Sequence, residues 1–141
     1  MTGCVLVGRW KLCYYGKCST RRNTVHPVTF ENMQLKPELL ERIRAKGFLQ
    51  PTPIQLQTIP LALDGHDIMG QARTGTGKTA SFGIPILNCL VPEGGMQALV
   101  ICPTRELSVQ VRNEIAFLGS TLGIQVVALY GGQSIEVQFN A

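Results

Sequence analysis

Aromatic and charged residues are both scarce in this 141-residue chain, at 6% and 16%. No apolar run approaches the ~18 residues that cross a bilayer, and the apolar residues 4–7 are too few for a signal-peptide core. The cysteines number 5, an odd count that argues against a disulfide framework. With 45% hydrophobic residues, the composition is that of one ordinary globular domain, and we expect it to be soluble and intracellular.

Positive charge is concentrated at the start of the chain. Residues 1–30 contain five basic residues and no acidic one, whereas residues 31–141 contain 8 basic and 9 acidic residues. The net charge of +4 therefore belongs to the first segment, and the rest is nearly neutral. Any binding of nucleic acid by the body of the protein must come from individually placed residues and not from bulk charge.

Residues 1–27 show no sustained period, and we interpret them as a basic, irregular tail. The tail could extend an RNA footprint through phosphate contacts, or it could be an organelle-targeting segment, and the sequence leaves both open. A zinc site in the tail is disfavoured because its four potential ligands lack the usual paired spacing; they are Cys4, Cys13, Cys18 and His26. Cys89 and Cys102 lie in apolar segments and are expected to be small core residues.

The remaining sequence alternates helical and apolar extended patterns. Helices are expected from Pro37 to a cap at Gly47, from Thr52-Pro53 with a kink at Pro60, and over 78–90 and 105–118. Continuous apolar strands are expected at 67–71, 98–102 and 124–130. This order predicts an α/β fold, a parallel β-sheet with helices on both faces. Three strands would leave sheet edges and an apolar face uncovered, so aggregation is an expected hazard.

A glycine-rich stretch between the first strand and the following helix is the strongest chemical signal. It matches the phosphate-loop pattern G-x-x-x-x-G-K-[ST], except that alanine replaces the first glycine. Its glycines let backbone N–H groups converge on a phosphate, the lysine reaches the outer phosphates, and the final threonine is a Mg²⁺ ligand. The residues are Ala72, Arg73, Thr74, Gly75, Thr76, Gly77, Lys78 and Thr79.

Gln55 and Phe30 are candidates for recognising the base of a nucleotide. A glutamine amide carries a donor and an acceptor in one plane and can pair with the N6 and N7 edge of adenine. A phenylalanine ring can stack on the adenine face. The alternatives are a helix-surface role for Gln55 and a packing role for Phe30 beneath the helix that begins at Pro37.

Four stretches together resemble the first half of the first RecA-like domain of a DEAD-box RNA helicase. They are GFLQPTPIQ at 47–55 with Phe30 upstream, ARTGTGKT at 72–79, PTREL at 103–107, and YGG at 130–132. The resemblance runs from about residue 28 to residue 141. It implies a Q-motif region at 28–56 and a partial RecA-like ATP-binding domain at 57–141, with the P-loop NTPase fold.

The resemblance also implies roles for individual residues. Phe30 and Gln55 would form the adenine sensor, and residues 72–79 would hold ATP and Mg²⁺, with Lys78 and Thr79 as the catalytic residues of this segment. RNA phosphates would be contacted by Pro103, Thr104, Arg105, Gly131 and Gly132. Considered alone, Thr104 is equally a helix N-cap and Arg105 a partner for Glu106. The full-length form is expected to be a cytoplasmic monomer.

The family's Asp-Glu-Ala-Asp motif does not occur in these 141 residues. Members of the family couple ATP hydrolysis to local RNA unwinding and use this motif to complete the magnesium site. We therefore expect the chain alone to bind ATP and RNA without turnover, as a piece of a longer helicase. The alternative is a non-catalytic ATP- or RNA-binding module that acts through partners.

Overall fold

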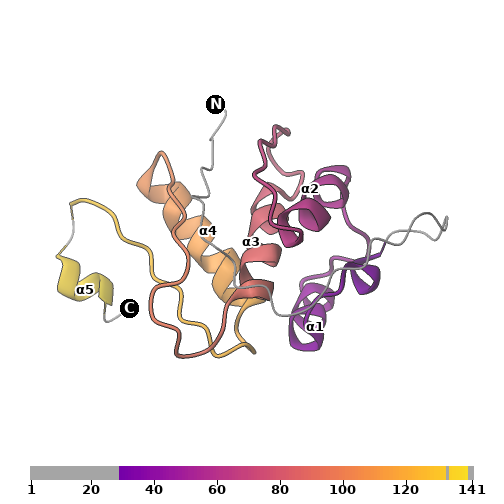
Figure 1. Cartoon of the computed structure of the whole chain (residues 1–141). Helices are drawn as coiled ribbons and strands as arrows, with labels where there is room; N and C mark the ends of the chain where they lie inside the picture. Colours follow the sequence, from indigo (N-terminus) through magenta and orange to yellow (C-terminus); the bar gives the residue numbers. More distant parts are fainter. Residues whose placement is uncertain (1–28, 133, 140–141) are drawn as a thin grey trace.

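The computed structural model describes residues 29–132 and 134–139. The basic tail at 1–27 and the four residues weighed as zinc ligands lie outside these ranges. Within them, the elements in chain order are a 3-10 helix η1 (Phe30–Met33) and five α-helices: α1 (Pro37–Ala45), α2 (Pro53–Leu63), α3 (Lys78–Cys89), α4 (Arg105–Leu118) and α5 (Ile135–Phe139). Figure 1 shows α3 between α2 and α4, with α1 beside them.

The helix boundaries follow local sequence signals. Pro37 opens α1, where a missing N–H costs nothing, and Gly47 follows its end at φ +82°, a left-handed conformation that suits glycine. Thr104 is the N-cap of α4, and Gly119 follows its last residue. The expected helices at 78–90 and 105–118 are confirmed by α3 and α4.

The hydrophobic core lies where α3 meets the helices around it. Ile84 and Leu87 of α3, Leu39 of α1, Ile59 of α2 and Leu118 of α4 are all fully buried. Full burial of such side chains contributes about 1.5–3 kcal/mol each, so this cluster is a main source of stability. The same core includes Phe30 and Met33 of η1 and the neighbouring Leu35.

The predicted parallel sheet is not formed among the described residues. Residues 67–71, 98–102 and 124–130 are extended but carry no strand assignment, and no backbone hydrogen bond joins one of these segments to another. The predicted sheet is therefore not confirmed, since a parallel strand gains its hydrogen bonds only from neighbouring strands, whereas a helix closes its own bonds locally. The apolar pattern of these segments indicates burial, but it does not specify which neighbouring strand each segment would pair with.

The extended segments nevertheless keep a two-residue alternation of burial. Along 124–130, Ile124 and Val126 pack on the core, whereas Val127 and Leu129 are exposed. Leu99 and Ile101 are likewise exposed, on either side of the half-buried Val100. These side chains are the uncovered apolar residues that the sequence led us to expect.

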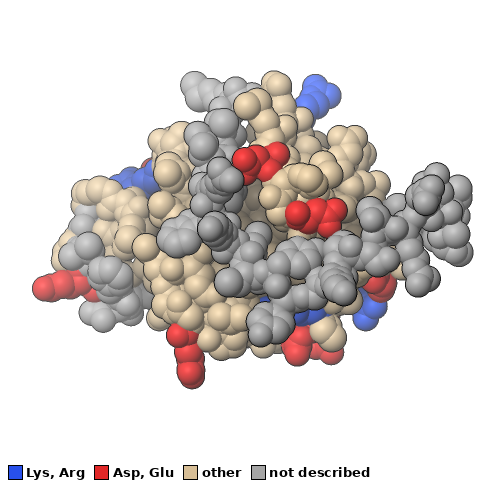
Figure 2. Space-filling view, viewed as in Figure 1, with Lys and Arg blue, Asp and Glu red and all other residues tan. Residues whose placement is uncertain are grey.

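Charge is sparse on the surface of the described residues. Figure 2 shows a few acidic and basic side chains among the uncharged residues that it describes on this face. The described residues of this face therefore form no broad basic patch, in keeping with the near-neutral count for residues 31–141. None of the described helices is both long and apolar enough to pass through a membrane.

Candidate functional site

The glycine-rich loop forms a curled turn that leads directly into α3. Gly75 and Gly77 have φ values of +79° and +83°, both in the left-handed region that favours glycine. The Thr76 hydroxyl donates to the Arg73 carbonyl at 2.7 Å, which tightens the turn. Gly77 is the N-cap of α3, so the first N–H groups of a 12-residue helix open toward the loop.

Lys78 lies across this loop. Its ammonium group donates a hydrogen bond to the Ala72 carbonyl, six residues back along the chain. A phosphate would have to draw the ammonium group away from this carbonyl, which is a weaker partner because it carries no full charge. The Thr79 hydroxyl lies on the first turn of α3. The ammonium and N–H donors at this position fit a phosphate, and the hydroxyl oxygen fits a magnesium ion bound to that phosphate.

The start of α2 is bonded to the phosphate loop by two side chains. The Thr52 hydroxyl donates to the Thr76 carbonyl at 2.9 Å, and the Gln55 amide nitrogen donates to the Gly77 carbonyl at 3.1 Å. The other end of the same amide, Gln55 Oε1, accepts from the Thr52 backbone N–H at 2.9 Å. Gln55 is only 2% exposed, so the amide is a buried bracket between the helix start and the loop.

The bracket accounts for only part of the bonding capacity of Gln55. A primary amide has two N–H donors and two acceptor lone pairs, and each atom uses one of these here. One donor and one acceptor therefore remain for a base. The structure brings Gln55 against the phosphate loop, and its pairing with adenine stays a prediction.

Phe30 lies in the hydrophobic core and not on an open surface. It is 2% exposed and packs in the cluster that includes Leu39 and Ile43 of α1. This is the packing role considered as its alternative. The stacking of its ring on adenine stays a prediction.

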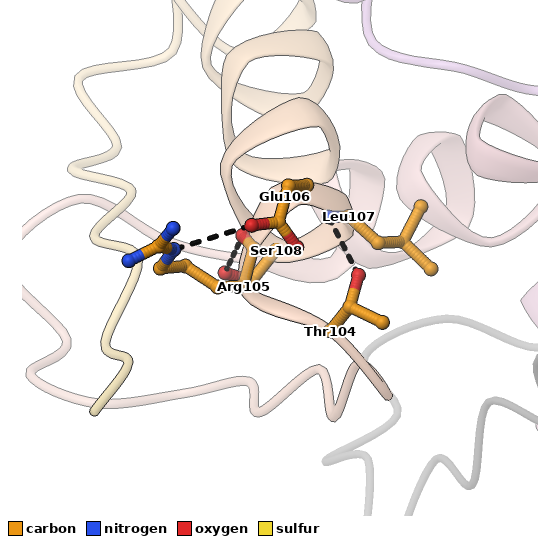
Figure 3. Close-up of polar contacts among 5 residues, drawn as sticks. All are labelled: Thr104, Arg105, Glu106, Leu107 and Ser108. Atoms are coloured by element: carbon orange, nitrogen blue, oxygen red, sulfur yellow. Dashed lines mark hydrogen bonds and ion pairs between the residues drawn. The ribbon is translucent and has the colours of Figure 1, made fainter. Parts of the chain in front are cut away.

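The start of α4 carries the predicted RNA-contacting residues. Thr104 Oγ1 accepts from the Leu107 N–H at 3.2 Å, and the Ser108 hydroxyl donates to the Arg105 carbonyl at 2.7 Å. Arg105 Nε lies 3.3 Å from Glu106 Oε1, and both side chains are mostly exposed (Figure 3). Thr104 thus acts as an N-cap, and Arg105 pairs with its neighbour, as the alternative interpretation expected.

Glu106 is a charged partner that an incoming phosphate would have to displace. Its own backbone N–H first, and then the Arg105 side chain, form hydrogen bonds that lower the pKa of this carboxyl. Because the pair is exposed, the attraction is weak and exchangeable. Arg105 can therefore turn from Glu106 to a phosphate oxygen at small cost.

A cavity of about 540 Å³ connects α4 with the end of the third extended segment. It is lined by Arg105, Glu106, Val109, Tyr130 and Gly132. The structure thus brings Arg105 and Gly132, which are far apart in the sequence, to one hollow. Pro103, Thr104 and Gly131 are not among its lining residues, although they adjoin it along the chain.

Sequence reasoning missed two side chains that shape these sites. Thr52 bonds the phosphate loop, and its signal was available, because Thr52 with Gln55 three residues later is a capping-box pattern. Gln138 is buried and bonds the backbone next to the glycine pair, and a lone glutamine near the chain end carries no motif. No group of three metal-ligating side chains occurs in the described part of the chain.

The geometry defines a class of protein first: one with a phosphate-loop type of turn at the start of α3 and a hollow at the start of α4 that is lined by Arg105 and Glu106. Comparison with known proteins narrows this class, since the family model described as DEAD/DEAH box helicase matches residues 52–141. The chain belongs to the DEAD/DEAH box helicase family, which confirms the resemblance drawn from the four sequence stretches.

Named relatives agree with this assignment. The chain is 51% identical over 115 residues to the DEAD-box ATP-dependent RNA helicase CshA of Streptococcus pneumoniae, covering 81% of this chain and 22% of that protein. It is 48% identical to CshA of Bacillus subtilis, with 81% and 23% covered. The chain therefore spans about a quarter of the length of the curated relatives it matches.

Solved structures give the same result for the fold. A DEAD box protein from Methanococcus jannaschii superposes with a TM-score of 0.75 at 42% identity, covering 79% of this chain and 31% of that one. Prp28 from Chaetomium thermophilum bound to ADP gives 0.71 at 39%, covering 80% and 29%. Dbp5 from S. cerevisiae bound to RNA and ADP BeF3 gives 0.60 at 30%, covering 76% and 29%. The path of the chain thus follows the RecA-like domains of these helicases, although no strand pairing forms among the residues that the structure describes.

Proposed function

We propose that this chain is the ATP- and RNA-binding N-terminal part of a DEAD-box ATP-dependent RNA helicase. The observation that carries the proposal is the bracket formed by Thr52 and Gln55 on the phosphate loop. It ties the glutamine that would identify the base to the loop that would hold the phosphates. In a complete helicase of this kind, ATP hydrolysis would drive local unwinding of an RNA duplex.

The chain's own residues have separable tasks in this proposal. Lys78 leaves the Ala72 carbonyl and meets the outer phosphates, while the first N–H groups of α3 surround the inner ones. The Thr79 hydroxyl would ligate Mg²⁺, which neutralises the phosphates when bound. The remaining donor and acceptor of Gln55 face the N7 and N6 positions of adenine, and Phe30 would stack on the ring.

ATP preference is tested by calorimetry with Mg²⁺. The wild-type chain should bind ATP and not GTP, and Lys78→Ala should bind neither. Gln55→Ala should lose the preference, whereas Gln57→Ala, an exposed position on the same helix, should retain it. If wild type binds ATP and GTP equally, the role of Gln55 as an adenine reader is wrong.

RNA binding is proposed at the hollow beside α4, through phosphates and without base specificity. Arg105→Ala should weaken binding uniformly across sequences and lower the slope of log affinity against log salt by about 1. Arg112→Ala, two turns further along α4, is the matched control. An unchanged slope for Arg105→Ala would remove this arginine from the interface.

The isolated 141-residue chain should bind ATP without turning it over, since the Asp-Glu-Ala-Asp motif is absent from its sequence. Steady phosphate release that disappears in Lys78→Ala would contradict this. The alternative of a non-catalytic module acting through partners is not favoured, because the relatives reported above are named as helicases. The cytoplasmic location and the monomeric state stay predictions.

A further inference from the structure

A buried glutamine on the last described helix bonds the backbone beside the glycine pair. Gln138 Oε1 accepts from the Tyr130 N–H at 2.8 Å, and Gln138 Nε2 donates to the Tyr130 carbonyl at 2.9 Å. Gln138 is 7% exposed. The side-chain amide therefore binds both backbone groups of one residue, as a neighbouring strand would do in a sheet. We refer to this pair of hydrogen bonds as the Gln138 clasp.

The clasp acts on the residue directly before a turn of two glycines. Gly131 and Gly132 have no side chains, and a Cβ placed at either would meet no atom within 4 Å. Gly132 has φ +88°, in the left-handed region that favours glycine, and a glycine backbone has many alternative conformations open to it. A fixed Tyr130 backbone directly before the pair therefore restricts where the turn can lie.

The position of this turn decides the shape of the hollow beside α4. The cavity is lined by Tyr130 and Gly132 at the end of the extended segment and by Arg105 and Glu106 at the start of α4. Arg105 is placed by α4, whose N-cap bond at Thr104 sets the start of the helix. Residues 124–130, which lead to Tyr130, form no helix and make no strand pairing. The clasp constrains the backbone of this segment, as the N-cap bond at Thr104 constrains the start of α4.

We propose that Gln138 is a positioning residue for RNA binding, holding the Gly131–Gly132 turn at a set distance from Arg105. This inference rests on the proposed RNA site. A single-stranded RNA backbone would contact Arg105 on one side and the turn on the other, and Gln138 itself would touch no RNA. Binding two points at once requires that the points keep their separation.

The test uses the full 141-residue chain and a uridine homopolymer as the RNA probe. Gln138→Met keeps the size of the side chain but removes both hydrogen bonds, and we expect RNA affinity to fall by about tenfold. Gln125→Met, at an exposed position on the extended segment that Gln138 bonds, is the control and should bind as wild type does. ATP affinity should be unchanged in both variants.

Amide hydrogen exchange separates positioning from general loss of structure. In Gln138→Met the Tyr130 amide should exchange faster than in wild type, while the Ile84 amide in the core should exchange at the wild-type rate. Equal acceleration at both amides would mean that the variant is merely destabilised and would overturn the inference. So would wild-type RNA affinity in Gln138→Met.

Arg105→Ala distinguishes failure of the inference from failure of the proposed function. If Arg105→Ala weakens RNA binding and Gln138→Met does not, only the role of Gln138 is wrong. If wild type and Arg105→Ala bind RNA equally, or neither binds it, the RNA site itself is wrong and the inference falls with it.

Discussion

Gly77→Ala should destabilise the protein more than the same change at Gly75, because only Gly77 lies against Gln55. Both glycines are left-handed, with φ +83° and +79°. A Cβ at position 77 would come within 2.4 Å of Gln55 Nε2, whereas one at position 75 would meet nothing within 4 Å. Both substitutions therefore place an alanine in the left-handed conformation, and only Gly77→Ala adds a steric clash with Gln55.

The size of the difference follows from what the Gln55 amide would lose. The left-handed conformation costs an alanine about 1–2 kcal/mol at either position. Gln55 is 2% exposed and bonded at both amide atoms, so it can move only by giving up its bonds to the Thr52 N–H and the Gly77 carbonyl. Two such bonds contribute about 1–3 kcal/mol, which predicts about 2–5 kcal/mol for Gly77→Ala against about 1–2 kcal/mol for Gly75→Ala.

Urea denaturation of six proteins would measure this difference: wild type, Gly75→Ala, Gly77→Ala and the same three with Gln55→Ala added. In a Gln55→Ala background the collision is gone, so Gly77→Ala should cost no more than Gly75→Ala. Equal costs at the two positions in the wild-type background would refute the reasoning, because they would show that the Gln55 amide is not held against Gly77.

Three further predictions concern stability. The hydrogen bond from Arg44 lowers the pKa of Glu31 from its ordinary 4.5 to about 2, so the pair stabilises the fold above pH 4.5 and this contribution is lost as the pH falls toward 2. The urea midpoint of wild type should thus fall more steeply across that range than that of Glu31→Gln, and parallel curves would count against the pair. Ile84→Ala, at a fully buried position, should reduce the free energy of unfolding by about 2–5 kcal/mol, while Leu49→Ala, 84% exposed, should leave the urea midpoint nearly unchanged. Thr104→Ala should cost about 1 kcal/mol in the same assay by removing the N-cap of α4, and Thr104→Ser should restore most of it.

The helices and the phosphate loop could be predicted because their signals are local. Pro37, Gly47 and Thr104 mark helix ends through bonds and conformations within a few residues of themselves. The spacing of Gly75, Gly77 and Lys78 likewise specifies a turn that opens a helix, and the structure has that turn. Such features depend on neighbours along the chain, which the sequence states directly.

The sheet and the side-chain bonds of the sites could not be predicted in the same way. The apolar runs at 98–102 and 124–130 indicated strands, yet no strand pairing forms among the described residues. Gln55 was identified as a reader of adenine, but its bond to Gly77 spans 22 residues and leaves no trace in local pattern. Gln138 was not identified at all, since its hydrogen bonds are made to the Tyr130 backbone, eight residues away.

The sequence by itself determined the family, the phosphate loop and the limits of the main helices, because each depends on residue types at short, fixed spacings. Only the tertiary structure decided that Gln55 is bonded to the loop, that Arg105 and Gly132 share one hollow, and that Phe30 lies in the core. The physical reason is that these contacts join segments distant along the chain, and their geometry is set by how α2, α3 and α4 pack.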